Sequence, residues 1–154
     1  MIQRIQTVYL LVITALTVAM LFLPLAVIQS GDTFYTFDAS GMSTMTTPAE
    51  LVYPAWALMA LACIISLLAL ATVFLYKKRV LQIRLCIFNA ILMIAFYGLF
   101  AFFVWKVAGE QTETFRFSVR IALSFPLIAL IFDYLAIRNI GADEVLIRSL
   151  NRLR

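Results

Sequence analysis

Few residues of this chain could do chemistry, and one acidic residue stands out among them. Asp133 lies inside an apolar stretch five residues before Arg138, and Asn89 lies inside another apolar stretch five residues after Arg84. If both stretches are antiparallel helices with a rise of about 1.5 Å per residue, the two polar groups lie at matching depth, about 7.5 Å from one membrane edge. The spacing therefore predicts that Asp133 accepts a hydrogen bond from Asn89. Either arginine can extend its charged end toward the carboxylate.

Three interpretations of this polar cluster stay open. A shallow group of Asp, Asn and Arg locks two helices together, and this interpretation is favoured. Ionisable residues inside apolar segments also mark functional sites, because burying a charge in hydrocarbon is costly, so a proton or ion relay is the second interpretation. No further acid lies deeper along a path across the bilayer, which weighs against a relay. In the third interpretation, interfacial water reaches the carboxylate.

Other catalytic chemistry is missing from the sequence. There is no histidine, and the two cysteines, Cys63 and Cys86, form no CxxC pair. We expect no catalytic residues, no metal site, no cofactor and no enzymatic activity. The basic residues lie beside apolar segments instead of forming a patch on a polar face, so we also expect no nucleic-acid binding.

Four apolar segments must position the polar cluster. Of the 154 residues, 64% are hydrophobic and 13% are charged, whereas soluble domains have about 25% charged residues. The segments cover residues 7–28, 53–76, 85–105 and 119–137, and each approaches or exceeds the roughly 20 residues that span a bilayer as a helix. The sequence therefore predicts an all-α membrane protein, a single integral domain over residues 1–154 with four transmembrane helices in an antiparallel up-down bundle. Pro126 is expected to bend the fourth helix.

The basic residues predict the orientation of these helices. Nine of the twelve Lys and Arg residues flank the segments on the side of the two termini. The positive-inside rule then places both termini, an inner loop at 77–84 and a tail at 138–154 in the cytoplasm. The outer loops at 29–52 and 106–118 form a small extracytoplasmic cap. We expect an uncleaved first segment, because its apolar run is longer than that of a signal peptide.

The outer loops contain a weak strand signal. Aromatic and Thr residues at 33–37 precede a turn cluster at 38–41, which favours a β-hairpin near 33–46. The segment ETFRFS in the second outer loop alternates polar and aromatic residues and could add a third strand. The alternative is an irregular cap whose aromatic residues lie in the headgroup layer.

The tail ends in GADEVLIRSLNRLR, which predicts a short amphipathic helix on the cytoplasmic surface. Its apolar face contains Leu146, Leu150 and Leu153, and its polar face contains Arg148 and Arg152. Such a helix can bind the anionic inner leaflet or a soluble partner protein. A third interpretation is a topology anchor with no partner.

Three stretches resemble a known family. The start MIQRIQTVYLL, the loop KKRVLQIRLCIFN and the end ADEVLIRSLNRLR are similar to the four-span membrane proteins of Bacteroidetes grouped as domain-of-unknown-function family 4293. The resemblance covers the whole chain and implies a bacterial inner-membrane protein with four helices. It implies no activity, substrate or catalytic residue.

The expected function is a structural, assembly or scaffolding role in the cell envelope, through lipid, a membrane or cytoplasmic partner, or further copies of the chain. The alternative is a subunit of an oligomeric transporter or channel whose path the Asp133 cluster lines.

Overall fold

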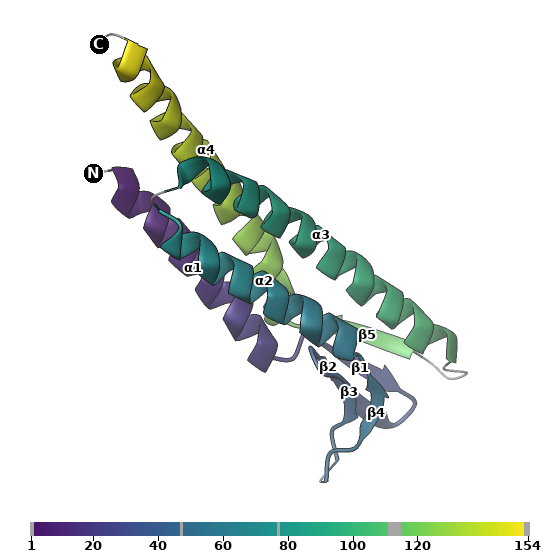
Figure 1. Cartoon of the computed structure of the whole chain (residues 1–154). Coiled ribbons are helices and arrows are strands. Elements are labelled where there is room, and N and C mark those ends of the chain that lie inside the picture. The colour runs from purple at the N-terminus through teal and green to yellow at the C-terminus, as the bar shows by residue number, and fades with distance from the viewer. Residues whose placement is uncertain (1, 47, 77, 111–114, 153–154) are drawn as a thin grey trace.

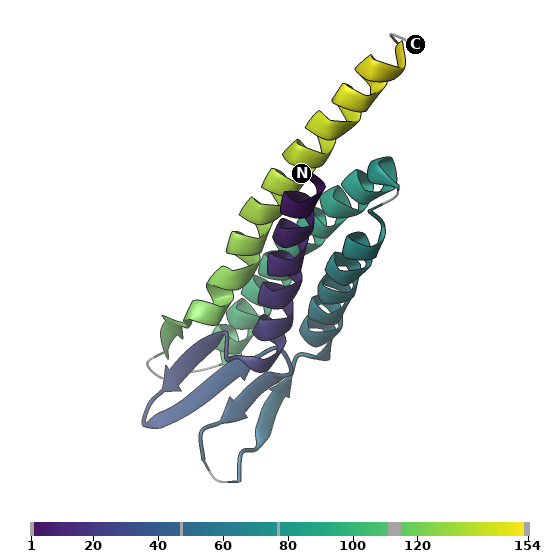
Figure 2. The same cartoon turned by 90° about the vertical axis from the view of Figure 1, so that its left-hand side faces the viewer.

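The computed structural model describes residues 2–46, 48–76, 78–110 and 115–152. Its four helices are α1 (Ile2–Phe22), α2 (Trp56–Phe74), α3 (Arg79–Glu110) and α4 (Phe125–Arg152), and a 3-10 turn, η1 (Ile121–Ser124), precedes α4. A five-stranded sheet lies across one end of the helices, and both chain ends lie at the other end (Figures 1 and 2).

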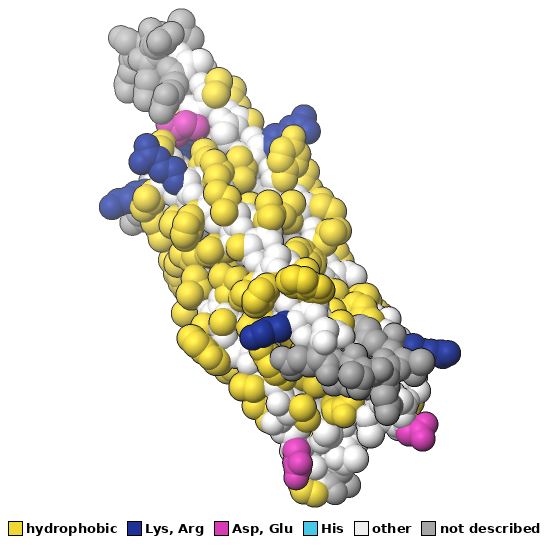
Figure 3. All heavy atoms as spheres, turned by 90° about the vertical axis from the view of Figure 1, so that its right-hand side faces the viewer, with side chains coloured by type: hydrophobic (Ala, Val, Ile, Leu, Met, Phe, Trp, Pro, Cys, Tyr) yellow, Lys and Arg dark blue, Asp and Glu magenta, His cyan; other side chains and the backbone are white. Residues whose placement is uncertain are grey.

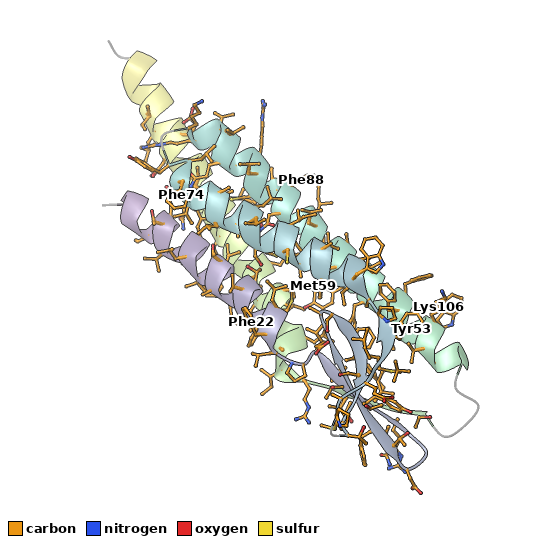
Figure 4. The ribbon with its side chains drawn as sticks, turned by 60° about the horizontal axis from the view of Figure 1, so that its bottom comes forward. Phe22, Tyr53, Met59, Phe74, Phe88 and Lys106 are labelled. Atoms are coloured by element: carbon orange, nitrogen blue, oxygen red, sulfur yellow. The ribbon has the colours of Figure 1, made fainter. Side chains whose placement is uncertain are left out.

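The helices pack side by side in a closed order. Contacts join α1 to α2, α2 to α3, α3 to α4 and α4 back to α1. All four helices are long and apolar enough to cross a membrane, and only 22% to 33% of each apolar span is buried inside the molecule. Apolar side chains therefore cover the outside of the helices, while charged side chains gather toward the two ends (Figure 3). Phe22, Phe74 and Phe88 are examples that point away from the helices (Figure 4).

The prediction of an all-α protein is wrong, because the outer segments form a sheet. Its strands are β1 (Ala26–Ser30), β2 (Thr33–Asp38), β3 (Gly41–Thr44), β4 (Leu51–Pro54) and β5 (Phe115–Val119). They are antiparallel in the order β4-β3-β2-β1-β5. The predicted hairpin near 33–46 is confirmed by the β2–β3 pair. The strand predicted in the second outer loop is β5. It does not extend the hairpin directly but pairs with β1, which lies between β5 and β2.

Strand β1 takes residues that hydropathy alone assigns to the first helix. Helix α1 ends at Phe22, two residues before Pro24, which lacks a backbone N–H and disfavours helical backbone at the residue before it. The chain then extends, and residues 26–30 alternate between buried and partly buried positions, as a strand with one face on a core does. The predicted apolar segment 7–28 is therefore a helix followed by a strand.

Glycine is required at the start of β3. Gly41 has φ 142°, and a Cβ atom there would collide with the backbone of Tyr53 and Ala55 in and after β4. The close approach lets the Ala55 N–H donate to the Ser40 carbonyl oxygen at 2.9 Å. This contact fixes the end of the sheet to the start of α2.

Aromatic side chains join the sheet to α3. The ring of Phe37 on β2 is fully buried and meets the ring of Phe100 edge to face at 5.3 Å. The ring of Phe100 also lies 6.3 Å from the ring of Phe117 on β5, and the ring of Tyr53 on β4 lies 6.1 Å from that of Phe103, measured between ring centres. The sheet and the helices thus share one core.

The fourth helix differs from its prediction at both ends. It begins at Phe125, so Pro126 lies in its first turn, where a missing N–H costs nothing, instead of bending the helix interior. It continues without a break to Arg152 and projects beyond the other helices (Figure 2). The predicted short, separate helix in the tail is therefore wrong: residues 138–152 are the last part of α4, which passes through Gly141 without a break.

Candidate functional site

The polar layer between α3 and α4 is the first candidate site. Asp133 on α4 lies beside Cys86 on α3, and each side chain is 1% exposed. Asn89 lies one turn further along α3 and is 2% exposed. Because Cys86 and Asn89 are three residues apart in a helix, they share the face that meets α4.

The expected hydrogen bond from Asn89 to Asp133 is not formed. Neither carboxylate oxygen of Asp133 has a hydrogen-bond partner among the described residues, and the Asn89 Oδ1 atom has none either. The Cys86 thiol is near the carboxylate without the geometry of a regular hydrogen bond. Three buried acceptor oxygens without donors destabilise the fold, so this layer lacks the bonds that a helix lock needs.

The two arginines predicted for this cluster lie elsewhere. Arg84 and Arg138 are both exposed, and neither donates to the Asp133 carboxylate. Chemically, the layer offers one carboxyl group, one amide oxygen and one thiol. It could accept a proton or a donor group. The described residues include no group of three or more His, Cys, Asp and Glu that could hold a metal ion.

A second polar contact joins the ends of the chain and was not predicted. The Gln6 Nε2 atom on α1 donates to the Asp143 Oδ2 atom on α4 at 2.7 Å, with both side chains buried. Only the donor could have been found from the sequence. Gln6 has helical spacing to Leu10 and Ile13, so it falls on the buried face of α1. The acceptor lies 137 residues away, so no local pattern could pair the two.

A third polar contact lies between α2 and α3 near the same end. The Gln82 Nε2 atom donates to the Thr72 carbonyl oxygen at 3.1 Å, and both residues are buried. Thr72 uses its own hydroxyl to donate to the Ala69 carbonyl oxygen. The Gln6–Asp143 bond thus joins α1 to α4, and this contact joins α2 to α3, both toward the end where the termini lie.

An open, basic groove of about 600 Å³ lies beside these contacts, between the start of α3 and the last part of α4. Lys78, Arg79 and Arg84 line it, and Glu144 faces them from α4. Arg84, which the sequence assigned to the Asp133 cluster, therefore belongs to this groove.

The residues predicted for the tail surface are only partly described. Leu146 lies on α4 and is 54% exposed. Leu153 and the side chains of Arg148, Leu150 and Arg152 lie outside the described part of the chain. Their predicted role at a lipid or partner surface stays a prediction.

The sequence matches one protein family over nearly its full length. The family model described as Domain of unknown function (DUF4293) covers residues 2–153. No curated protein matches the chain.

Proposed function

We propose that this chain, which belongs to the DUF4293 family, is a non-enzymatic scaffold of the bacterial inner membrane. The observation that carries the proposal is the continuous core between the sheet and the helices, centred on Phe37 and Phe100. Such a core holds the sheet in a fixed position relative to the spanning helices. A rigid platform outside the membrane is what a scaffold presents to other envelope components.

The proposed orientation places the sheet outside and both termini in the cytoplasm. Nine of the twelve basic residues lie in three parts of the sequence: near the N-terminus, from position 77 to position 84, and from position 138 to the end. The positive-inside rule assigns such segments to the cytoplasm. Trp56 at the start of α2 and Trp105 near the end of α3 lie toward the sheet, away from the basic ends of the helices, and each side chain is 75% exposed. Exposed tryptophans at helix ends suit a membrane interface. The Lys106 ammonium lies 5.9 Å from the centre of the Tyr53 ring at this end (Figure 4).

The sealed polar layer supports a scaffold over a carrier. Asp133, Asn89 and Cys86 are all at most 2% exposed, and the sites of a transport path must be open to one side of the membrane in turn. Three grooves are lined by residues near the ends of the helices and not by the polar layer. One is the basic groove, the second contains Leu23 and Phe125, and the third contains Phe102 and Gly109.

A second candidate function, a subunit of an oligomeric transporter or channel, is favoured by one observation. The unpaired oxygens of Asp133 and Asn89 destabilise the fold, and they form no hydrogen bond within the described residues that would offset this. Polar groups that destabilise a fold are often kept for function.

Complementation of a deletion strain separates the two functions. If the protein is a scaffold, Asp133→Asn at wild-type abundance restores resistance to detergent and osmotic stress in full. Replacement of residues 26–54 by a flexible linker, with the helices still inserted, abolishes that rescue. If Asp133→Asn fails to rescue while it accumulates normally, the scaffold proposal is wrong and the transport function is supported.

Labelling of single cysteines tests the orientation. Both native cysteines are first replaced by alanine. A membrane-impermeant maleimide added to intact spheroplasts should then label Ser40→Cys, in the β2–β3 turn. It should label Ser149→Cys, on the exposed end of α4, only after lysis. The reverse pattern would contradict the proposed topology.

A further inference from the structure

The basic groove brings together two segments that are distant in the sequence. Lys78, Arg79 and Arg84 come from the connection between α2 and α3 and from the first turns of α3, and Glu144 comes from α4. Among these lining residues three are positive and one is negative, so the groove carries a net charge of about +2. That charge favours an anionic ligand.

One of these cations lacks the hydrogen bond that it needs. The Arg79 Nη1 atom is buried and has no hydrogen-bond partner among the described residues. A guanidinium group presents its N–H donors in a planar fork that fits the oxygens of a phosphate. Because Arg79 lines the groove, a ligand with phosphate-like oxygens bound there would supply an acceptor for this donor.

Part of the wall of the groove is apolar. Val80 and Ile147 line it beside the charged residues, and they are 44% and 39% exposed. A soluble anion gains nothing from such walls. A ligand with a charged head and a hydrocarbon chain uses both kinds of surface.

The position of the groove along the helices fits the same ligand. The apolar span of α3 begins at Arg79, and that of α4 ends at Ile147. The groove thus lies at the level where the spanning segments meet the headgroup layer. Arginine and lysine at this level are attracted to anionic lipids.

We infer that this groove binds the phosphate group of an anionic phospholipid, with Arg79 donating to the phosphate and Lys78 and Arg84 supplying charge. The upper part of an acyl chain packs on Val80 and Ile147. The inference rests on the membrane placement proposed above but does not depend on the scaffold role or on the orientation.

Native mass spectrometry of the full-length protein in detergent tests the inference. The probes are phosphatidylglycerol, phosphatidylcholine with the same acyl chains, and inorganic phosphate. Phosphatidylglycerol should form a one-to-one complex at a lower concentration than phosphatidylcholine. The double variant Arg79→Gln, Arg84→Gln should need about thirtyfold more phosphatidylglycerol, at about fivefold for each basic residue removed. Arg138→Gln removes an exposed arginine that does not line the groove and should bind like wild type.

Three results of the lipid titrations would overturn the inference: equal binding of the two lipids by the wild-type protein, unchanged binding by the double variant, and equal loss in Arg138→Gln. Displacement of the lipid by inorganic phosphate at matching concentration would also overturn it, because the site would then hold a free anion. If the double variant does not fold, Arg84→Gln alone changes an exposed side chain and should weaken binding about fivefold. None of these results depends on complementation, so the groove and the scaffold function can fail separately.

Discussion

Replacing Asp133 by alanine should stabilise the protein, although the residue is fully buried. Both carboxylate oxygens lack a donor among the described residues, and a buried polar group without a hydrogen bond costs about 1–3 kcal/mol. If the deleted carboxyl group leaves a cavity of about 30 Å³, the cavity costs about 0.7 kcal/mol. The higher helix propensity of alanine returns about 0.5 kcal/mol. The expected net gain is about 1–3 kcal/mol.

Asp143→Ala is the matched control, because the same substitution is made ten residues later in the same helix. Asp143 accepts from the Gln6 Nε2 atom at 2.7 Å, and both side chains are buried. Its removal leaves that donor unpaired at a cost of about 1–3 kcal/mol, which the gain in helix propensity offsets only in part. The two variants should therefore change stability in opposite directions.

Unfolding in mixed micelles measures both variants. The fraction of SDS at half-unfolding, followed by the far-UV circular dichroism of the helices, should rise for Asp133→Ala and fall for Asp143→Ala. A loss of more than about 1 kcal/mol in Asp133→Ala would refute the reasoning, because Asp133 would then have the bonds of a helix lock. A stabilised variant that fails to complement would show that Asp133 is kept for activity at the expense of stability.

Further predictions concern the sheet and the tail. Phe37→Ala should lower the free energy of unfolding by about 3–5 kcal/mol, because its fully buried ring packs on Phe100. The control Phe34→Ala, at a ring that is 49% exposed, should change it by less than about 1 kcal/mol. Equal effects of the two substitutions in denaturant titrations would contradict the packing. Gly41→Ala should cost at least about 2 kcal/mol, because φ is 142° and a side chain meets backbone atoms, and limited proteolysis should then cut the sheet faster than in wild type. Gly141→Ala should stabilise α4 by about 0.5–1 kcal/mol, since a Cβ there has open space; a fall in helical circular dichroism would show that α4 is not continuous.

The four helices were predictable because their signal is local. Long uncharged runs such as the one beginning at Trp56 are apolar enough for hydrocarbon, where a single segment satisfies its own backbone groups only as a helix. Their bounds were less predictable, because hydropathy measures the solvent that a segment prefers and not its backbone conformation. Residues 26–28 are as apolar as the helix before them, yet they form a strand. Pro24 was the available signal for that boundary.

Of the candidate sites, only the polar layer around Asp133 was predicted, and its contacts were not. Helical rise placed Asp133 and Asn89 on facing helices, but it cannot say how each helix is rotated about its axis or which atoms meet. Rotation is decided by packing along the whole helix, which here puts Asp133 beside Cys86 and leaves the Asn89 oxygen unpaired. It also turns Arg84 toward the groove and away from the acid.

The sequence by itself determined the number of helices that are long and apolar enough to cross a membrane and the end at which the basic residues gather, because each depends on composition within one segment. The tertiary structure alone decided the order of the five strands, the Gln6–Asp143 bond and the basic groove. Each of these joins residues from segments that are distant in the chain. The free energy of such pairs comes from the packing of the whole fold, and no local pattern of residues records it.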